Sequence, residues 1–324
     1  MILLYPASAY LCTGNRQSFG GSMSKIMKSS FSSHPYMLLF ISILSVSISS
    51  IMIKFSDTPT SVAGMYRLFI SVILMLAIVP RRSLRSLTMN KKDWGLVTLA
   101  GLFLGLHFLF WMESLIHTSV ASSMVILALQ PLFVMIGSYL LFKEQVSRLT
   151  ILCLIVALLG SIVIAWGDIG VSAAALLGDG LSLIGTLFVS MYLLVGQKVS
   201  HKIHANIYSI IVFLIGGTVM LIYNLIHDYS LIAYSAPDWT YFLLLAVIPT
   251  IFGQYLFNLL LHSIGATTVS VGIIGEPVLA IILAYLLLGE HISWLQLTGG
   301  LLTLLGMGLY FWSKSLNYKL QNNH

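Results

Sequence analysis

Charged residues are scarce in this chain. Only 8% of its 324 residues are Asp, Glu, Lys or Arg, and 58% are apolar, whereas a soluble domain carries about 25% charged residues. The chain therefore lacks the polar surface of a soluble globular protein. Its two cysteines, Cys12 and Cys153, lie far apart and form no CxxC pair. They predict neither a disulfide framework nor a zinc site.

Motifs for ATP-driven transport or metal-dependent catalysis are also missing. The sequence contains no phosphate-cradling GxxxxGK[ST] loop, which argues against an ATP-driven pump. It contains no HExxH motif, so it indicates no metal and no cofactor. The net charge of +6 is scattered over short segments between apolar blocks. That distribution indicates membrane topology and no nucleic-acid partner.

The apolar residues fall in blocks of about 20, the length that crosses the hydrocarbon core of a bilayer. We therefore predict an all-α integral membrane protein surrounded by lipid. Ten transmembrane helices are predicted, at residues 36–54, 60–80, 94–116, 119–142, 149–167, 175–197, 206–226, 239–262, 267–288 and 293–313.

The basic residues predict that both termini are cytoplasmic. With the N-terminus inside, 14 of the 16 Lys and Arg residues fall in inside segments, and only Lys54 and Arg67 do not. This is the positive-inside pattern of a multi-pass protein of the cytoplasmic membrane. Residues 1–22 hold an apolar run that is too short to span. They are either a cytoplasmic tail or lie upstream of a translation start at Met23 or Met27.

Part of the sequence is repeated. Residues 131–168 align with residues 277–314 at a constant offset of 146, and 12 of the 38 pairs are identical. The identical pairs include several that a leucine-rich composition does not produce: Pro131/Pro277, Glu144/Glu290, Ser147/Ser293, Gly160/Gly306 and Trp166/Trp312. Ser147 and Ser293 stand where helices begin, and serine is a favoured N-cap. Each repeat unit then contains five helices, an odd number, so the second copy enters the membrane in the opposite orientation.

The repeat divides the chain into a cytoplasmic tail (1–35), a first repeat (36–168), a second repeat (175–314) and a short cytoplasmic tail (315–324). Inverted repeats are typical of transporters, because they supply two interconvertible arrangements around a site near the membrane midplane. We therefore predict a secondary transporter of a small polar metabolite, such as an amino acid or a related compound, that works by alternating access. The alternatives are a translocase of a lipid-linked intermediate, a polytopic membrane enzyme and a receptor.

Several stretches resemble a known family. HTSVASSMVILALQPLFVMIGSYLLFKE (117–144) and IGATTVSVGIIGEPVLAIILAYLLLGEHISWLQLTGGLLTLLGMGLY (264–310) are similar to the two EamA domains of the drug/metabolite transporter superfamily. Arg67 resembles that family's arginine in helix 2, and residues 178–181 resemble the opening of its helix 6. The resemblance implies ten helices in a 5+5 inverted arrangement, with helices 5 and 10 peripheral. It also implies secondary transport, often export, of small solutes.

Three prolines are predicted to break helices near the midplane. Pro131, Pro249 and Pro277 each remove a backbone hydrogen bond. They should free the carbonyls of Leu127, Leu245 and Ile273, respectively, around one shared cavity.

Glu276 directly precedes Pro277, in the middle of a predicted helix. An ionisable group at that depth costs several kcal/mol and needs an explanation. Glu276 could bind a substrate ammonium or take up a coupling proton, or it could be a protonated side chain that bonds a freed carbonyl. Gln130 occupies the equivalent position in the first repeat, and the two are expected to face each other across the cavity.

Further candidates lie in other helices. Arg67 could attract an anionic group, snorkel to the interface, or pair with an acid such as Asp57. His107 could relay protons or bind substrate, or be a satisfied interhelical histidine. Trp111 could line a cavity or anchor the chain at the interface.

Gln254 and Asn258 are one helical turn apart and are expected to share a face. They could present donors and acceptors to a substrate or hold helices together. The glycines at positions 299, 300, 306 and 308 predict close helix packing. That packing could lie within the chain or between the protomers of a homodimer.

Overall fold

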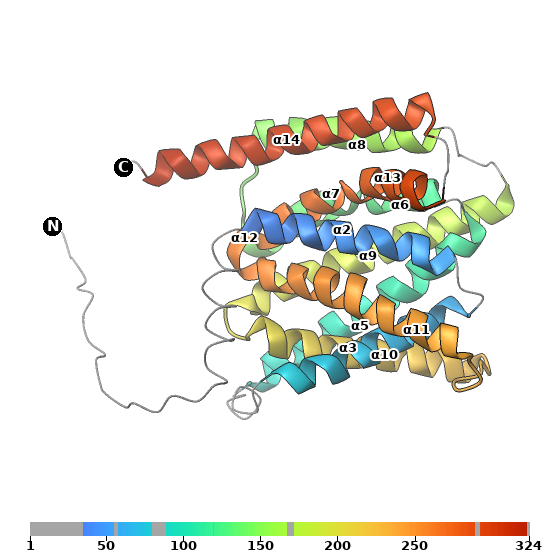
Figure 1. The fold of residues 1–324 in the computed structure, drawn as a ribbon. Coiled ribbons are helices and arrows are strands. Elements are labelled where there is room, and N and C mark those ends of the chain that lie inside the picture. Colours follow the sequence, from blue (N-terminus) through green and yellow to red (C-terminus); the bar gives the residue numbers. More distant parts are fainter. Residues whose placement is uncertain are drawn as a thin grey trace, which may run out of the picture. The chain divides into compact units, whose positions relative to one another are not determined.

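The computed structural model describes residues 35–54, 58–79, 89–118, 120–166, 172–288 and 292–322. Within these ranges the chain is helical apart from short turns and connections (Figure 1). Several predictions concern residues outside these ranges. They are the tail 1–35, of which only Pro35 is described, the alternative starts at Met23 and Met27, and the side chains of Asp57 and Glu290. The helices are α2 (Pro35–Lys54), α3 (Thr60–Ile78), α5 (Lys91–His117), α6 (Val120–Leu127), α7 (Gln130–Phe142), α8 (Arg148–Trp166), α9 (Ala173–Ser200), α10 (Ala205–Ile226), α11 (Ala236–Leu245), η1 (Ala246–Tyr255), α12 (Leu256–Ile273), α13 (Glu276–Leu288) and α14 (Trp294–Asn322).

Many of these helices have the length and composition of membrane spans. Among the described residues, seven helical segments are long and apolar enough to cross a bilayer, and two shorter apolar helices accompany them. Each of the ten predicted ranges overlaps helical residues of the structure. The prediction of an all-α membrane protein is therefore confirmed. The seven long segments are Thr60–Ile78, Lys91–His117, Ser122–Phe142, Ala173–Ser200, Ala205–Ile226, Ala236–Ile273 and Trp294–Ser313.

Serine side chains cap the helices of the repeated segment. The Ser147 hydroxyl accepts from the amide of Thr150 at 3.1 Å, and the Ser293 hydroxyl accepts from the amide of Gln296 at 3.2 Å. Both bonds satisfy a first-turn N–H group that has no partner within the helix. The predicted N-caps of α8 and α14 are thus confirmed.

Two helix breaks occur at corresponding positions of the repeat. The break between α6 and α7 lies at residues 128–129, directly before Gln130 and Pro131. The break between α12 and α13 lies at residues 274–275, directly before Glu276 and Pro277. A proline has no N–H group to continue the helical ladder, which accounts for a break at both places.

Pro249 produces a different distortion. It lies inside η1, a ten-residue π-helix that joins α11 to α12. Because Pro249 cannot donate to Leu245, the carbonyl of Leu245 instead accepts from the hydroxyl of Thr250 at 2.8 Å. The prediction of an unpaired carbonyl at Leu245 is therefore wrong, since the next residue along the chain supplies its donor.

α12 contains a sharp turn between two predicted helices. Gly265 has a φ angle of +75°, a conformation that glycine adopts without steric cost. The amide of the following residue, Ala266, donates to the side-chain oxygen of Gln197 at 2.7 Å. This turn separates the predicted helix 239–262 from the predicted helix 267–288, and the bond ties it to α9.

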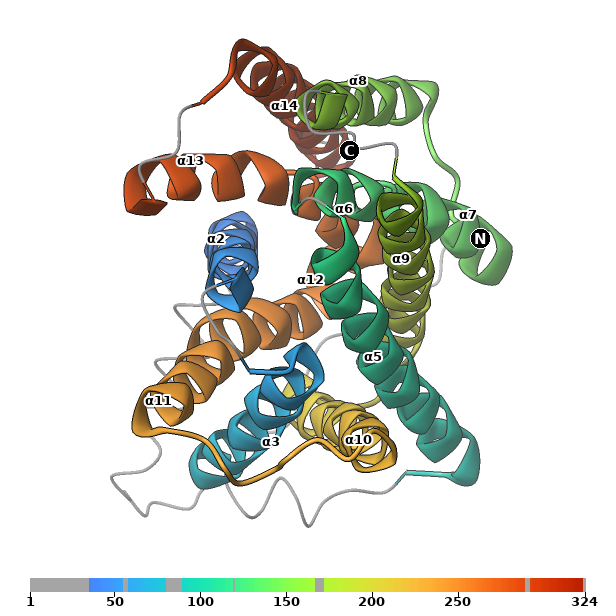
Figure 2. The same cartoon turned by 90° about the vertical axis from the view of Figure 1, so that its right-hand side faces the viewer.

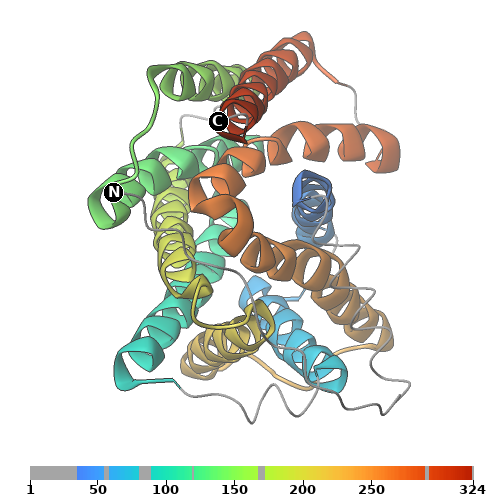
Figure 3. The same ribbon diagram turned by 90° about the vertical axis from the view of Figure 1, so that its left-hand side faces the viewer.

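α8 and α14 run side by side at one edge of the bundle, as the opposite views of Figures 2 and 3 show. Glycines allow their backbones to approach closely. A Cβ atom added at Gly299 would lie 2.6 Å from the carbonyl oxygen of Gly160, and one added at Gly306 would lie 2.7 Å from that of Cys153. The glycine packing predicted from the sequence at these two positions thus occurs within the chain, while a Cβ at Gly308 would meet nothing within 4 Å.

This packing leads to a prediction with a matched control. Gly306→Ala should destabilise the protein by about 1–3 kcal/mol, because the added methyl group overlaps the backbone of α8. Gly308→Ala places the same methyl group on the same helix in open space and should not lower stability. Thermal unfolding of both variants in detergent measures the difference. Equal melting temperatures would contradict the α8–α14 contact.

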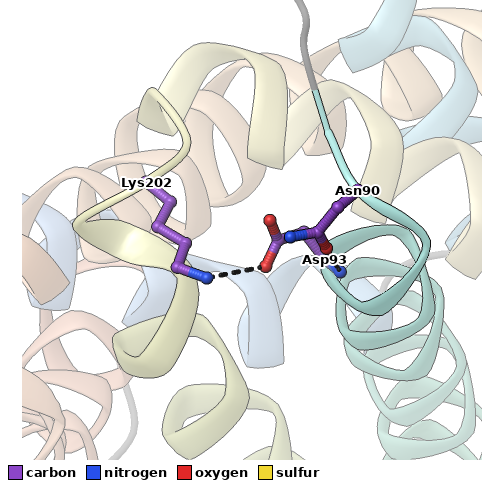
Figure 4. Close-up of polar contacts among 3 residues, drawn as sticks. All are labelled: Asn90, Asp93 and Lys202. Carbon is purple, nitrogen blue, oxygen red and sulfur yellow. Dashed lines mark hydrogen bonds and ion pairs between the residues drawn. The ribbon is translucent and has the colours of Figure 1, made fainter.

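One ion pair joins two ends of helices. The amino group of Lys202, in the short connection between α9 and α10, lies 3.1 Å from a carboxylate oxygen of Asp93 near the start of α5 (Figure 4). Asn90 caps α5 by accepting from the amide of Asp93 at 2.8 Å. Because 59% of the Lys202 side chain is exposed, solvent screens the pair, and such pairs contribute about 0–1 kcal/mol.

Candidate functional site

A small cavity lies where the broken helices meet α2, α3, α5 and α9. Its free volume is about 30 Å³, on the scale of a single water molecule. The described conformation therefore has no room for a solute of amino-acid size, and helices or side chains need to move before such a solute can bind. The cavity is lined by Val46, Ser49, Arg67, His107, Phe108, Trp111, Leu127, Gln130, Val189, Gln254, Phe257, Ile273 and Glu276.

Six of the seven side chains predicted for the site converge on this cavity. They come from five elements: Arg67 from α3, His107 and Trp111 from α5, Gln130 from α7, Gln254 from η1 and Glu276 from α13. Leu127 and Ile273, whose carbonyls the prolines were predicted to free, also belong to the lining. The roles of these residues stay predictions.

Arg67 is held at the cavity by hydroxyl groups. Its side chain is buried, with 1% of its surface exposed, so it does not snorkel to the membrane interface. Nε donates to Thr250 Oγ1 at 3.0 Å, Nη1 donates to Ser49 Oγ at 3.3 Å, and the guanidinium carbon lies 4.4 Å from the ring centre of Phe108. A guanidinium group has five N–H donors, so these two bonds position it without using all of them.

No carboxylate of the described residues lies within 4.0 Å of the Arg67 guanidinium. Glu276 lines the same cavity but forms no direct ion pair with it. A buried cation and a buried carboxyl group are thus held apart on one cavity. This arrangement suits a ligand that carries both an anionic and a cationic group.

The two residues before the helix-breaking prolines are placed alike. The hydroxyl of Ser47, on α2, donates to the carbonyl of Ile43 at 2.8 Å and lies 3.3 Å from the backbone carbonyl of Glu276. The hydroxyl of Ser190, on α9, donates to the carbonyl of Thr186 at 2.7 Å and lies 3.5 Å from the backbone carbonyl of Gln130. Each broken helix is therefore in contact, next to its break, with one serine from a neighbouring helix.

His107 and Trp111 form one wall of the cavity. His107 Nδ1 lies 2.9 Å from the carbonyl oxygen of Gly185. Because a carbonyl oxygen only accepts, Nδ1 carries the proton and Nε2 is left as the acceptor. The Trp111 ring stacks on His107 at a centroid distance of 5.9 Å. Only 3% of Trp111 is exposed, so it is not an anchor at the lipid interface.

Several polar atoms around the cavity lack a hydrogen-bond partner within the described part of the chain. They are Trp111 Nε1, both amide atoms of Gln130, and Oε1 of Glu276. Buried polar groups in native proteins are nearly always paired, and each unpaired one costs about 1–3 kcal/mol. Three such side chains on a single cavity indicate that water or a ligand supplies their partners.

Asn258 does not belong to this group. Its side-chain oxygen accepts from the hydroxyl of Tyr192, and its amide nitrogen donates to Ser209 at 2.9 Å. Asn258 thus joins α9, α10 and α12, while Gln254 lines the cavity. Both side chains lie against the Tyr192 hydroxyl, in agreement with the predicted shared face. A contact of Asn258 with a substrate stays a prediction.

Two polar residues of the site were not predicted. Ser49 and Thr250 hold the Arg67 guanidinium, and both are fully or almost fully buried. The signals were present, since Ser49 belongs to a serine-rich stretch of α2 and Thr250 follows a helix-breaking proline. No group of three or more His, Cys, Asp or Glu among the described residues could hold a metal ion.

Comparisons with known proteins identify the family of the chain. The model of the EamA-like transporter family matches residues 34–166 and again residues 176–312. Two proteins of similar sequence are named as uncharacterized transporters. One is sll1164 of Synechocystis sp., 28% identical over 70% of this chain and 68% of its own. The other is YetK of Bacillus subtilis, 28% identical over 70% of each chain.

The fold also matches a solved structure. A crystal structure of another protein superposes with a TM-score of 0.73 over 89% of this chain and 99% of its own. The sequences are 15% identical, so this likeness concerns the fold alone.

Proposed function

Because the chain belongs to the EamA-like transporter family, we propose that it is a secondary transporter that exports a small polar metabolite across the cytoplasmic membrane. The observation that carries this proposal is the central cavity. It brings a buried arginine together with a buried glutamate and with polar atoms that have no partner among the described residues. A zwitterionic solute such as an amino acid would place its carboxylate at Arg67 and its ammonium at Glu276.

We further propose that the ten helices form two inverted five-helix repeats that alternate around this cavity. The matching breaks before Gln130 and Glu276 support this arrangement, as do the matching contacts of Ser47 and Ser190 with the carbonyls of Glu276 and Gln130. Inverted repeats permit two states related by exchange of conformation between the halves. The distribution of basic residues supports an orientation with both termini in the cytoplasm.

Transport by purified protein tests the proposal. The protein would be reconstituted into liposomes and supplied with a panel of labelled amino acids and related metabolites, with and without a proton gradient. At least one solute should show saturable flux that unlabelled solute accelerates from the opposite side. Efflux from cells that overexpress the protein tests the direction. If no small polar solute crosses, and only a lipid-linked compound does, the proposed function is wrong.

Trp111 provides a prediction about affinity. Trp111→Phe keeps an aromatic wall but removes an indole N–H donor that has no partner within the described part of the chain. If the solute accepts this hydrogen bond, KM should rise about two- to tenfold. Trp94→Phe is the matched control, because Trp94 lies on the same helix and is 46% exposed. An unchanged KM in Trp111→Phe would show that the solute does not contact this nitrogen.

A further inference from the structure

A second, larger cavity lies at the end of the bundle that carries Lys202. Its free volume is about 340 Å³, roughly ten times that of the central cavity. It lies between the end of α9, the start of α10 and the segment of α12 before Gly265. Its polar lining includes His201, Lys202, His204, Tyr208, Asn258 and His262.

The first turn of α10 opens on this cavity. His204 is the N-cap residue, but its side chain makes no capping bond. The first helical amides that bond backward are those of Ile207 and Tyr208, which both donate to the carbonyl of His204 at 3.0 Å. The N–H groups of Ala205 and Asn206 precede these bonds. The N-terminus of a 22-residue helix carries partial positive charge and attracts anions.

Tyr208 contributes a buried donor without a partner. It lines the cavity, only 3% of it is exposed, and its hydroxyl has no hydrogen-bond partner among the described residues. A buried hydroxyl without a partner is uncommon in native proteins. Its presence beside a helix N-terminus is a second, independent indication of a ligand with acceptor oxygens.

The charges around the cavity agree with such a ligand. Lys202 and three histidines belong to the lining, and the lining contains no Asp or Glu. Asp93 pairs with Lys202 but does not itself line the cavity, and the ammonium group has three donors. The ring centroids of His201, at the end of α9, and His262, on α12, lie 4.8 Å apart.

From these observations we propose that this cavity binds an oxyanion, either a carboxylate or a phosphate group. The ligand is held by the N-terminus of α10, the Tyr208 hydroxyl and the Lys202 ammonium. The positive-inside pattern places this end of the bundle in the cytoplasm. If the chain transports as proposed above, the cavity is the cytoplasmic docking site for the anionic group of the solute.

Polar side chains link the lining of the docking site to that of the central cavity. Asn258 lines the docking cavity and accepts from the hydroxyl of Tyr192. Gln254, four residues earlier, lines the central cavity. Tyr192 is fully buried and stacks on Tyr208 at a ring distance of 6.3 Å.

Binding of inorganic phosphate to the full-length protein tests the site without any need for flux. Thermal unfolding would be followed in liposomes of phosphatidylcholine, with phosphate replacing chloride at constant ionic strength. Wild-type protein should be stabilised with a saturating dependence on phosphate. Tyr208→Phe should weaken the apparent affinity about tenfold, since it removes one bond to a charged ligand. The hydroxyl has no hydrogen-bond partner among the residues that the structure describes, so the variant should fold.

Lys202→Met and Lys198→Met form the matched pair. Each removes one positive charge, but Lys198 does not line the cavity. Only Lys202→Met should weaken phosphate binding. Equal effects of both variants, or stabilisation by chloride as strong as by phosphate, would overturn the proposal. Flux that persists without phosphate binding would overturn the docking site and leave the transport function intact.

The same measurement in vesicles that contain phosphatidylglycerol separates two sources of the oxyanion. An undiminished phosphate effect assigns the site to a soluble ligand. Loss of the effect assigns the site to a lipid headgroup and overturns its role in docking the solute.

Discussion

Glu276→Gln is expected to reduce saturable flux about 10- to 100-fold while the protein still folds. Glutamine has nearly the shape of glutamate, so the packing of α13 is kept. It cannot carry a negative charge or exchange a proton, and a bond to a charged group is worth about 1.5–3 kcal/mol. The variant also gives both repeats a glutamine before the proline, because Gln130 occupies the equivalent position.

The control for this variant is Glu113→Gln. Glu113 lies on α5 and does not line the central cavity. Its side chain is 38% exposed, and its carboxylate oxygen Oε1 lies 3.5 Å from Nε2 of His117. Flux through proteoliposomes should be close to that of the wild type. If Glu276→Gln is as active as Glu113→Gln, the glutamate neither binds the solute nor couples transport to a proton.

Arg67→Lys is expected to lower flux about tenfold or more, although the positive charge is retained. A lysine ammonium is a compact point charge, whereas the guanidinium is planar and donates in fixed directions. The substitution therefore loses the simultaneous bonds to Thr250 and Ser49. It also loses the pair of parallel N–H donors that would bind a carboxylate. A hydrogen bond to a charged group contributes about 1.5–3 kcal/mol.

Lysine is a better test than alanine at this position, because alanine would leave a large void in a buried site and could unfold the protein. Arg148→Lys at the exposed start of α8 provides the control. Flux and thermal unfolding would be measured on both. Wild-type KM in Arg67→Lys would show that the charge suffices and that no directed contact with the solute is made.

The positions of the helices could be predicted because several signals in the sequence mark them. Blocks of about 20 apolar residues, short basic connections and the serine caps at Ser147 and Ser293 are visible in the sequence. The breaks at Pro131 and Pro277 were equally predictable, because a proline cannot donate to the helical ladder. All of these signals are local.

The form of the third break was not predictable in the same way. Pro249 indicates a disruption but does not determine whether the chain kinks or widens into a π-helix. The outcome depends on the Thr250 hydroxyl, which donates to Leu245 and accepts from Arg67 on another helix. That partner is 183 residues away in the sequence. Gln254 and Asn258 both lie against the Tyr192 hydroxyl, yet only Gln254 lines the central cavity. Spacing along one helix does not encode where that cavity ends.

The composition of the site was predicted better than its contacts. Arg67, His107, Gln130 and Glu276 are conspicuous because polar groups are costly in a membrane. Ser49 is not conspicuous, since serines in apolar helices usually bond to their own backbone. Its contact with Arg67 depends on how α2 packs beside α3, and a single helix does not encode that.

Access to the central cavity from each side of the membrane tests the account most directly. Val46, which lines the cavity, would be changed to cysteine after Cys12 and Cys153 are replaced by serine. A membrane-impermeant thiol reagent would then be applied to oriented vesicles from one side or the other. The account predicts labelling from both sides and protection from both sides by the transported solute. Labelling from one side only, whatever the solute or gradient, would contradict alternating access around this cavity.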